Sequence, residues 1–254
     1  MSMEVNPHYE HLREFVIALP SRFDQEGTLI YDDRNKIKKF TIGGETVVVK
    51  RFRRPNFVQK VAYTFFKKGK AERAYRNGGR LLELGFSTPV NIAFLETKHG
   101  GLLEDGFLVT GVDDTPPIRE LLEWPAQFDR RLAKAFAAFA VSLHEKGVLH
   151  DDLNSTNVQY DDRGGDDIRF SLIDINRMHF REGWPPLHEC LENITRFTYK
   201  EDLFDFVARN YIEMRGMGEK ELKALFAAKK RHNFSRVRKK LMKKWLLFRW
   251  LRSR

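Results

Sequence analysis

The eight-residue stretch from His150 to Asn157, HDDLNSTN, holds a histidine, two adjacent carboxylates and two amide side chains. A further acid, Asp174, follows the apolar run FSLI. Carboxylate and amide oxygens are the ligands that Mg²⁺ prefers, and Mg²⁺ neutralises phosphate charge during phosphoryl transfer. Asn157 and Asp174 therefore suit a metal, whereas Asp152 suits the role of orienting an attacking hydroxyl.

The elements around this loop are predicted to bring these oxygens together. Residues 118–150 are helical in composition, with an alanine-rich face that carries aromatic residues and ends at Gly147. Two short apolar runs follow, NVQY and FSLIDI, with the polar loop DDRGGDD between them, which indicates a β-hairpin. The acid of the loop, the amide at the head of the first strand and the acid at the end of the second strand then meet at one place.

The N-terminal half alternates strand-like and helical segments. The runs GTLIY, KIKKFTI and ETVVVKRF, separated by the turn signals DDRN and GG, predict a three-stranded antiparallel meander. A helix over residues 67–84 and the strands VNIAFLE and GFLVTGV are expected to follow, and the chain is expected to be helical after Asn193. Three valines before Lys50 indicate a buried strand, whose lysine needs an anionic partner.

Composition places the chain among folded globular proteins. Its 254 residues, 42% hydrophobic and 31% charged, are enough for one large domain or two lobes sharing a cleft. The N-terminus shows no basic start before an apolar run, and no eighteen apolar residues follow one another, so neither export nor a membrane span is predicted. One cysteine, Cys190, cannot form an intramolecular disulfide, which fits a reducing compartment. A cytoplasmic location is expected.

The loop resembles the protein-kinase pattern H-x-D-L-x-x-x-N, and LIDIN resembles the metal-binding D-F-G segment of those enzymes. The resemblance implies that Asp152 is the catalytic acid and that Asn157 and Asp174 hold Mg²⁺. His150 is expected to be a structural hydrogen bonder beneath the loop rather than a base, because the pattern gives that role to Asp152.

The strand VVVK resembles the kinase V-A-I-K strand, so Lys50 is expected to contact the α and β phosphates of ATP. In kinases a glutamate from the following helix pairs with this lysine. Glu72 is the single acid in the first turns of the predicted helix and is the expected partner, although spacing to FSTPV would place that position at Arg76. The run FLVTGV resembles the hinge that meets adenine.

Within the kinase superfamily, GVLHDDLNSTNVQY, FSLIDINRMHF and CLENITRF resemble the lipopolysaccharide kinase (Kdo/WaaP) family, over roughly residues 25–215. The resemblance implies an α+β, two-lobed protein-kinase-like fold. We expect an antiparallel-sheet N-lobe over 1–110 and a mainly helical C-lobe over 111–228. The implied activity transfers the γ-phosphate of ATP, with Mg²⁺, to a sugar hydroxyl of the lipopolysaccharide inner core, on Kdo or heptose of a lipid-linked glycan.

Three departures from the kinase pattern keep other functions open. No G-x-G-x-x-G covers the phosphates, Asn176 replaces the glycine of D-F-G, and Asp151 stands where many protein kinases have arginine. The alternatives are a kinase for another small molecule or for protein, and a pseudokinase scaffold that binds membrane or nucleic acid. The intact acid, amide and lysine positions favour an enzyme, whereas the missing glycine loop favours the scaffold.

Charge is segregated along the chain, whose net charge is +10. Residues 229–254 hold 12 Lys and Arg and no acid, whereas the other 228 residues carry 33 Lys and Arg against 35 Asp and Glu. A second basic stretch, residues 50–80, has 11 Lys and Arg against the single acid Glu72. Segregation of this kind indicates an anionic partner.

The C-terminal basic segment is predicted to be an amphipathic helix of its own, over residues 229–254. An apolar stripe runs along it at steps of three and four residues: Phe234, Val237, Leu241, Trp245 and Phe248. Basic residues around such a stripe are typical of helices that lie on anionic membranes. We therefore expect a peripheral position on the inner face of the cytoplasmic membrane. A helix docked on the C-lobe and an RNA-binding tail are the alternatives, and nucleic acid is the less favoured partner.

Overall fold

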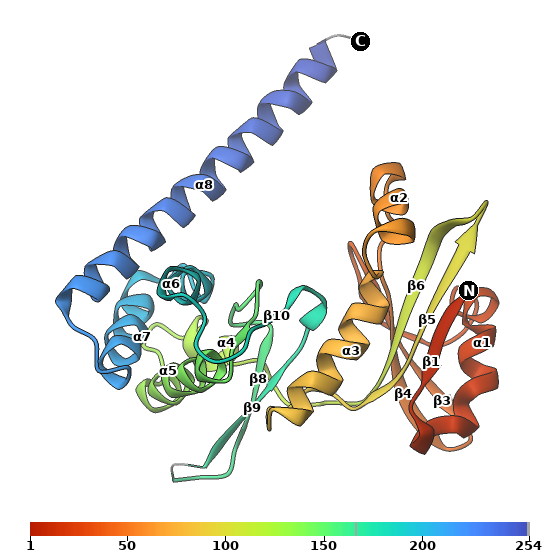
Figure 1. Cartoon of the computed structure of the whole chain (residues 1–254), viewed down its shortest axis with the longest axis horizontal. Helices are drawn as coiled ribbons and strands as arrows, with labels where there is room; N and C mark the ends of the chain where they lie inside the picture. The colour runs from red at the N-terminus through yellow and green to blue at the C-terminus, as the bar shows by residue number, and fades with distance from the viewer. Residues whose placement is uncertain (166, 253–254) are drawn as a thin grey trace. The chain divides into compact units, whose positions relative to one another are not determined.

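A computed structural model describes residues 1–165 and 167–252, without the side chains of 239, 240, 243, 244 and 246–252. The chain divides into two compact units (Figure 1). The first unit comprises Met1–Thr115 and Phe170–Met178, and the second comprises Pro116–Arg169 and His179–Arg254.

The first unit is built on a six-stranded antiparallel sheet with the strand order β1-β5-β6-β4-β3-β2. Its strands are β1 (Ser2–Val5), β2 (Thr28–Asp32), β3 (Lys36–Ile42), β4 (Glu45–Arg51), β5 (Asn91–His99) and β6 (Leu102–Gly111). The predicted meander corresponds to β2, β3 and β4, and the two later strands correspond to β5 and β6. The sequence interpretation missed β1, which pairs with β5.

Helix α1 (Arg13–Arg22), preceded by the 3₁₀ helix η1 (Pro7–Leu12), was also missed. Phe15, Val16 and Leu19 of this helix are buried in a core with sheet residues that include Val47 and Val49. A ten-residue helix with a proline inside it has a weak local signal, and packing against the sheet stabilises it.

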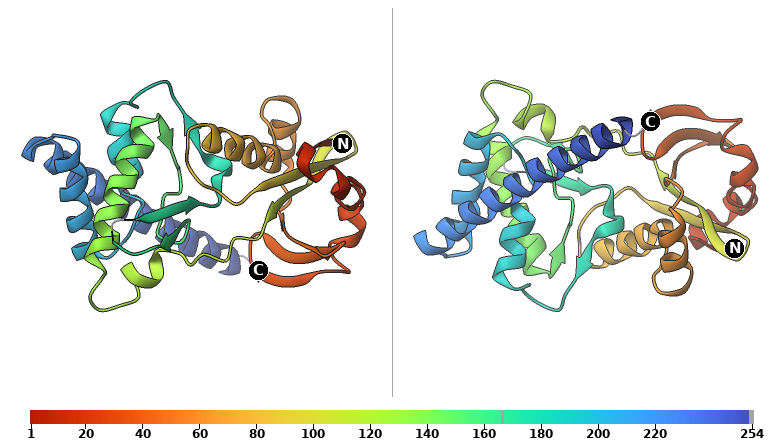
Figure 2. Two further views of the ribbon diagram at one scale, coloured as in Figure 1. Left: turned by 90° about the horizontal axis from the view of Figure 1, so that it is seen from below. Right: turned by 90° about the horizontal axis from the view of Figure 1, so that it is seen from above.

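Strand alternation gives the sheet two different faces. Because successive side chains point to opposite sides, Val49 faces the α1 core and Lys50 the other side. Phe94 of β5 contacts Tyr75 of α3 (Lys70–Glu83), with ring centroids 5.4 Å apart. Helices α1 and α3 thus cover opposite faces of the sheet (Figures 1 and 2). Lys50 lies on the face that α3 covers.

The N-terminus of α3 is fixed to β5 by Glu96. The Glu96 carboxylate accepts hydrogen bonds from the backbone N–H groups of Ala71 and Glu72, both at 3.1 Å. Burial raises the pKa of Glu96. At Gly69 a Cβ atom would overlap this carboxylate, so a larger residue would force Glu96 to shift from the position in which it accepts these hydrogen bonds.

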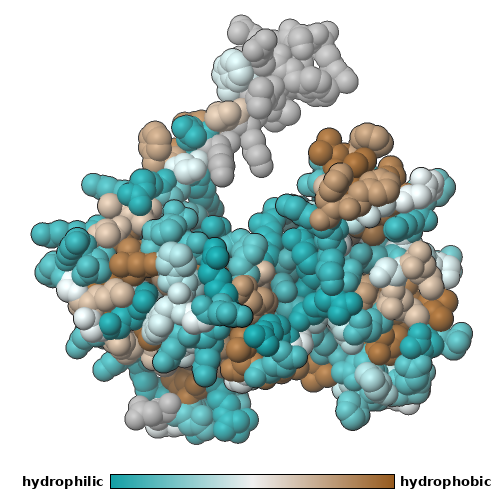
Figure 3. Space-filling view, viewed as in Figure 1, coloured by the Kyte–Doolittle hydropathy of each residue, from teal (hydrophilic) through white to brown (hydrophobic). Residues whose placement is uncertain are grey.

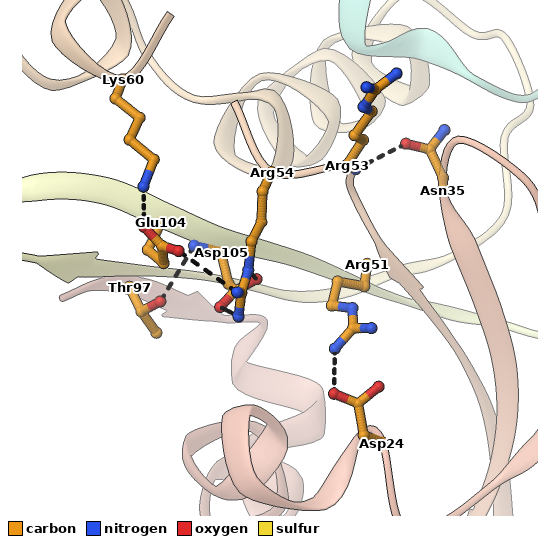
Figure 4. A network of polar contacts seen from close by, with 9 residues as sticks. All are labelled: Asp24, Asn35, Arg51, Arg53, Arg54, Lys60, Thr97, Glu104 and Asp105. Atoms are coloured by element: carbon orange, nitrogen blue, oxygen red, sulfur yellow. Dashed lines mark hydrogen bonds and ion pairs between the residues drawn. The ribbon is translucent and has the colours of Figure 1, made fainter. Parts of the chain in front are cut away.

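Helix α2 (Phe57–Phe65) was not predicted. Polar contacts attach its surroundings to β6 (Figure 4): Arg54 donates two hydrogen bonds to Asp105, both at 2.8 Å, and Lys60 pairs with Glu104. None of its nine residues is buried.

The segment Phe170–Met178 packs with the first unit, whereas the sequence division assigned it to the C-lobe. Asn77 of α3 donates to the carbonyl of Ile175 at 2.7 Å, and Thr88 donates to the carbonyl of Leu172 at 2.8 Å. These hydrogen bonds explain the difference. The boundary also follows Thr115 rather than residue 110.

The second unit is mainly helical. Its elements are α4 (Arg119–Leu122), α5 (Arg130–Glu145), β7 (Val148–Leu149), β8 (Val158–Asp162), β10 (His179–Phe180), α6 (Leu187–Ile194), α7 (Glu201–Met214) and α8 (Glu219–Arg252), and β9 (Ile168–Leu172) crosses the boundary between the units. The predicted helix over 118–150 divides because Asp129 starts a new helix, accepting from Leu132 N at 2.9 Å. Phe136 of α5 stacks on Phe197, with centroids 4.1 Å apart.

The last helix begins at Glu219, ten residues before the predicted basic helix. Leu222, Leu225 and Ala228 are buried in its first turns. Its second half extends beyond α6 and α7 (Figure 1). In that half, the stripe residues Phe234, Val237, Leu241 and Trp245 are 56–69% exposed, and the side chain of Phe248 lies outside the described residues. No helix in the described part of the chain is long and apolar enough to cross a membrane.

Candidate active site

Lys50 and Asp174 meet in the first unit, with Lys50 Nζ 2.6 Å from Asp174 Oδ1. Lys50 lies in β4 between Ile37 of β3 and Leu108 of β6, so its strand is central and the prediction of a buried strand is confirmed. Both side chains are largely buried, at 17% and 31% exposure. The anionic partner that a buried lysine requires is thus Asp174.

The backbone of Asp174 has φ 55° and ψ 39°, the left-handed conformation, and among non-glycine residues that the structure describes it is alone in having positive φ. Asn176 supports the carboxylate by donating to Oδ1 at 2.9 Å. Asn77 fixes the next peptide through the carbonyl of Ile175. Backbone strain held in place by surrounding contacts is common at functional sites.

Glu72 does not have the partner predicted for it. Its carboxylate pairs with Lys68 at 2.9 Å and with Arg76 at 2.8 Å, one helical turn away on either side. These local cations lower its pKa despite the opposing effect of burial. The expectation that Glu72 pairs with Lys50 is corrected accordingly, because helical i, i+4 neighbours satisfy Glu72 and Asp174 satisfies Lys50.

Lys70, at the start of α3, was not singled out from the sequence. Its pKa is lowered, first by burial and then by the cations Arg177 and Arg73, whereas Asp174 raises it. A half-buried ammonium among other cations has a strong electrostatic preference for an anion such as phosphate. The density of basic residues between 50 and 80 was the available signal for it.

In the second unit, the predicted catalytic loop follows β7. Asp152 Oδ1 accepts from Asn154 Nδ2 at 3.1 Å, and the Asp152 N–H donates to His150 Nδ1 at 3.1 Å. His150 is fully buried and therefore supports the loop from beneath. No described residue donates to Asp152 Oδ2, which leaves this oxygen available to accept a proton or hydrogen bond.

Asn157 is brought to the same loop by its amide nitrogen, which donates to the carbonyl of Asp152 at 2.8 Å. This contact fixes the orientation of the side chain and leaves the carbonyl oxygen Oδ1 with no donor from the described part of the chain. An amide oxygen held in this way is a suitable ligand for Mg²⁺.

A hydrogen-bonded chain across the second unit holds the loop. Arg215 donates to Tyr211 Oη at 2.9 Å, Tyr211 Oη contacts His144 Nδ1 at 2.7 Å, and His144 Nε2 contacts Asn193 Oδ1 at 3.1 Å. Asn193 Nδ2 then donates to the carbonyl of His150 at 2.7 Å. Because Asn193 Oδ1 can only accept, His144 carries its proton on Nε2 and accepts from Tyr211. Burial lowers the pKa of His144 to about 4.

Each unit offers an oxygen group that suits a hard divalent cation. Asp174 in the first unit has a carboxylate and Asn157 in the second has an amide oxygen, the chemistry that Mg²⁺ prefers. Among the residues that the structure describes, no cluster of three or more His, Cys, Asp or Glu could hold a metal. A soft-metal site of the zinc type therefore has no support there.

The chain is similar to one protein family in sequence and to solved structures in fold. The model of the lipopolysaccharide kinase (Kdo/WaaP) family matches residues 37–214. A search of the curated proteins finds no match. Among solved structures, WaaP in complex with acyl carrier protein is similar, with a TM-score of 0.63 and 18% identity over 91% of this chain and 98% of that one.

An aminoglycoside-3'-phosphotransferase of type VIII also matches, with a TM-score of 0.53 and 14% identity over 89% of this chain and 99% of that one. These likenesses confirm the predicted α+β, protein-kinase-like fold. The family model covers well over half of the chain. The chain belongs to the lipopolysaccharide kinase (Kdo/WaaP) family.

Proposed function

We propose that the protein transfers the γ-phosphate of ATP to a sugar hydroxyl, on Kdo or heptose, of the lipopolysaccharide inner core. Family membership supports a kinase of the lipopolysaccharide core. The contact between Lys50 and Asp174 is the observation that carries the assignment of the nucleotide site, because it joins two motif residues 124 positions apart in the sequence. If the two short motifs resembled those of kinases by chance, there would be no reason for their residues to be in contact.

Each residue has a chemical role in this proposal. The acceptor hydroxyl gives its proton to the carboxylate of Asp152 while its oxygen forms a bond to the γ-phosphorus. The bond from that phosphorus to the β–γ bridging oxygen breaks, and ADP leaves. Lys50 donates to phosphate oxygens. Asn157 and Asp174 would hold Mg²⁺, which supplies charge neutralisation.

The missing glycine-rich loop is the main feature that favours a scaffold. Lys70 offers a different route to phosphate binding, because burial and the nearby cations Arg177 and Arg73 lower its pKa and so disfavour its positive charge, whereas Asp174 opposes them. A phosphate group would stabilise that charge. This cation supports phosphate binding without a glycine-rich loop.

The proposal includes an anionic membrane surface as a partner, on the inner face of the cytoplasmic membrane. The substrate would be a lipid-linked glycan, so the enzyme must work at a bilayer. Support comes from the second half of α8, where apolar stripe residues are exposed among basic ones. The first turns of α8 are buried, so the alternative of a helix docked on the C-lobe applies to those turns alone.

The test is to incubate the pure protein with Mg²⁺, γ-labelled ATP and a panel of acceptors. The panel holds deacylated inner-core oligosaccharides, free sugars, an aminoglycoside and a protein substrate. We expect label in the inner-core oligosaccharides, and labelling about 10²- to 10⁴-fold slower with the Asp152→Asn variant. Label that appears only in protein or in the aminoglycoside would overturn the acceptor assignment.

A further inference from the structure

A pocket lies beside the catalytic loop within the second unit, with a volume of about 350 Å³. Its walls come from β7, β10, α6 and the residues next to them: Leu149, Asp151, His179, Phe180, Arg181, Glu189, Glu192, Asn193 and Arg196. Asp151 precedes Asp152 in the chain. The volume is in the range of small-ligand sites.

Basic side chains in this pocket contact acids. Arg181 makes two hydrogen bonds to Glu189, at 2.7 and 2.9 Å. His179 Nε2 lies 3.0 Å from Asp151 Oδ2, a contact that is an ion pair only when the imidazole is protonated. These contacts shape the walls of the pocket.

Arg196 is the exception. Its Nε atom is buried and has no hydrogen-bond partner, and its guanidinium forms no ion pair with any residue that the structure describes. A buried charged donor without a partner is destabilising, and a guanidinium fork matches carboxylate and phosphate oxygens in pairs. The pocket therefore contains an arginine whose charge no described residue neutralises, although its Nε is closed to solvent.

The remaining polar groups suit a polyhydroxylated ligand. The side chain of Glu192 is exposed at the pocket and can accept hydrogen bonds from hydroxyl groups, as can Asp151. A ligand that satisfies both these groups and Arg196 carries hydroxyls and one anionic group. An acidic or phosphorylated sugar has this chemistry.

We propose that this pocket binds the acceptor, and that Arg196 selects acceptors with a carboxylate or phosphate near the hydroxyl to be phosphorylated. This inference rests on the proposed function and adds the residue that determines acceptor specificity. Arg196 is a binding residue here, since proton transfer belongs to Asp152.

The experiment compares kinetics on matched acceptors. A deacylated inner-core oligosaccharide is used intact, after reduction of its carboxylates to alcohols, and after removal of its phosphates. With Arg196→Gln, KM for the intact acceptor should rise about 10- to 100-fold, the usual effect of losing a charged hydrogen bond. The turnover number and KM for ATP should change less than about threefold. The variant should have similar KM values for the intact acceptor and for the acceptor that lacks the recognised anionic group.

The parent enzyme shows which anionic group is bound. A higher KM after reduction of the carboxylates identifies the carboxylate, and a higher KM after removal of the phosphates identifies the phosphate. Arg196→Lys, which keeps the charge, should restore part of the preference. Arg209→Gln, an exposed arginine paired with Asp205 on α7, is the matched control and should behave as the parent. If Arg196→Gln raised KM equally for charged and neutral acceptors, or did not raise it, the proposed role of Arg196 would be overturned. Absence of sugar phosphorylation by the parent would instead overturn the proposed function.

A second, independent observation concerns α2 in the first unit. Its ends carry four large apolar side chains that are 68–79% exposed: Phe57, Val58, Phe65 and Phe66. Figure 3 shows a hydrophobic area over α2. Exposed apolar clusters of this kind mark sites of interaction.

The helix is well held despite its exposure. Asn56 and Gln59 form a capping box at its N-terminus, and Lys60 pairs with Glu104 (Figure 4). Polar side chains thus attach α2 to β6 while apolar ones face outward. This is the reverse of the usual pattern for a helix on a globular domain.

Charge identifies the occupant. From Arg51 to Ala71 the chain has seven Lys and Arg and no acid. Arg53 and Lys67 are exposed, and their side chains form no ion pair with any residue in the described ranges. Apolar side chains flanked by unpaired cations match the interface of an anionic bilayer. We infer that α2 inserts its phenylalanines into an anionic lipid surface, separately from α8.

Flotation of the full-length chain with anionic vesicles tests this inference. The double variant Phe65→Ser, Phe66→Ser should lower the partition coefficient about 10-fold or more. Leu82→Ser, which removes an exposed apolar residue of α3, should leave it unchanged. Phosphorylation of a deacylated acceptor should be unaffected by either change, which separates this result from failure of the proposed function. An unchanged partition coefficient in the double variant would overturn the inference and favour a protein partner for α2.

Discussion

Lys50 Nζ lies 2.6 Å from Asp174 Oδ1, so the strand lysine and the acid of the metal-binding motif form a direct pair in the first unit. Glu72, the residue expected to pair with the lysine, is instead held by Lys68 and Arg76. In the proposed nucleotide site, Lys50 thus pairs with Asp174 and not with the acid of α3.

Substitutions of the two acids should therefore differ in effect. Asp174→Ala removes a metal ligand and the partner of Lys50, so we expect the affinity for Mg·ATP to fall about 10-fold or more. Glu72→Gln weakens only the pairings with Lys68 and Arg76, away from Lys50, and should change that affinity less than about threefold. Isothermal titration of both variants with Mg·ATP checks this. A larger loss for Glu72→Gln than for Asp174→Ala would contradict the assignment.

Acid should destabilise the fold through His144. Burial lowers the pKa of His144 to about 4 from its usual 6.5, so below pH 6.5 the unfolded chain binds a proton that the folded chain does not. The free energy of unfolding therefore falls as pH drops from about 6.5 to about 4, by up to about 3 kcal/mol from this group. Urea unfolding at pH 7 and pH 5 measures the change.

His144→Gln is the matched variant for that measurement. It should be less stable than the parent at pH 7, because the contacts to Tyr211 and Asn193 are weakened. Its stability should depend less on pH between 7 and 5. The same pH dependence in parent and variant would show that other groups cause the acid effect.

The entry to the catalytic loop depends on Gly147. Its φ is +75°, and a Cβ atom there would overlap the carbonyl oxygen of Arg181, whose N–H donates to Gly147 O at 2.9 Å. Gly147→Ala should lower the free energy of unfolding by several kcal/mol, on the order of 3 or more, because strain and overlap add. Gly85 has a similar φ of +85°, but a Cβ atom there would lie in open space. Gly85→Ala should therefore lower the free energy of unfolding by only about 1 kcal/mol. Similar losses in both variants would show that overlap at Gly147 is unimportant.

The sequence predicted the elements whose signals are local. The strands around Lys50 and the loop from His150 to Asn157 follow from valine runs, turn residues and motif spacing. It could not predict α1, whose stability comes from packing on the sheet, or the true partner of Lys50, which lies 124 residues away.

Long-range polar contacts were equally hidden. Asn193 lies in a segment that resembled the family, yet its contact with the carbonyl of His150 joins residues 43 apart. The orphaned Nε of Arg196 is a property of its surroundings and has no counterpart in residue order. Helix α2 was not predicted at all, and the exposure of its aromatic residues is known only from the structure.

Deleting residues 233–254 should separate the proposed roles of α8. Phe234, Val237 and Leu241 are exposed, so the melting temperature should change by no more than a few degrees. Binding to anionic vesicles should fall about 10-fold or more, with a remainder through α2. A sharp fall in melting temperature would indicate a docked helix instead. Retention on RNA with steep salt dependence and indifference to vesicles would indicate a nucleic-acid tail.

The most direct test of the central claim is phosphate transfer by Asp152→Asn. The substitution keeps the shape of the side chain but removes the carboxylate that accepts the proton of the sugar hydroxyl, so the turnover number should fall about 10²- to 10⁴-fold. The affinity for Mg·ATP, measured by titration, should stay within about threefold of the parent value. Transfer to an inner-core oligosaccharide at the parent rate would contradict the role of Asp152 and, with it, the account of this loop as the catalytic centre.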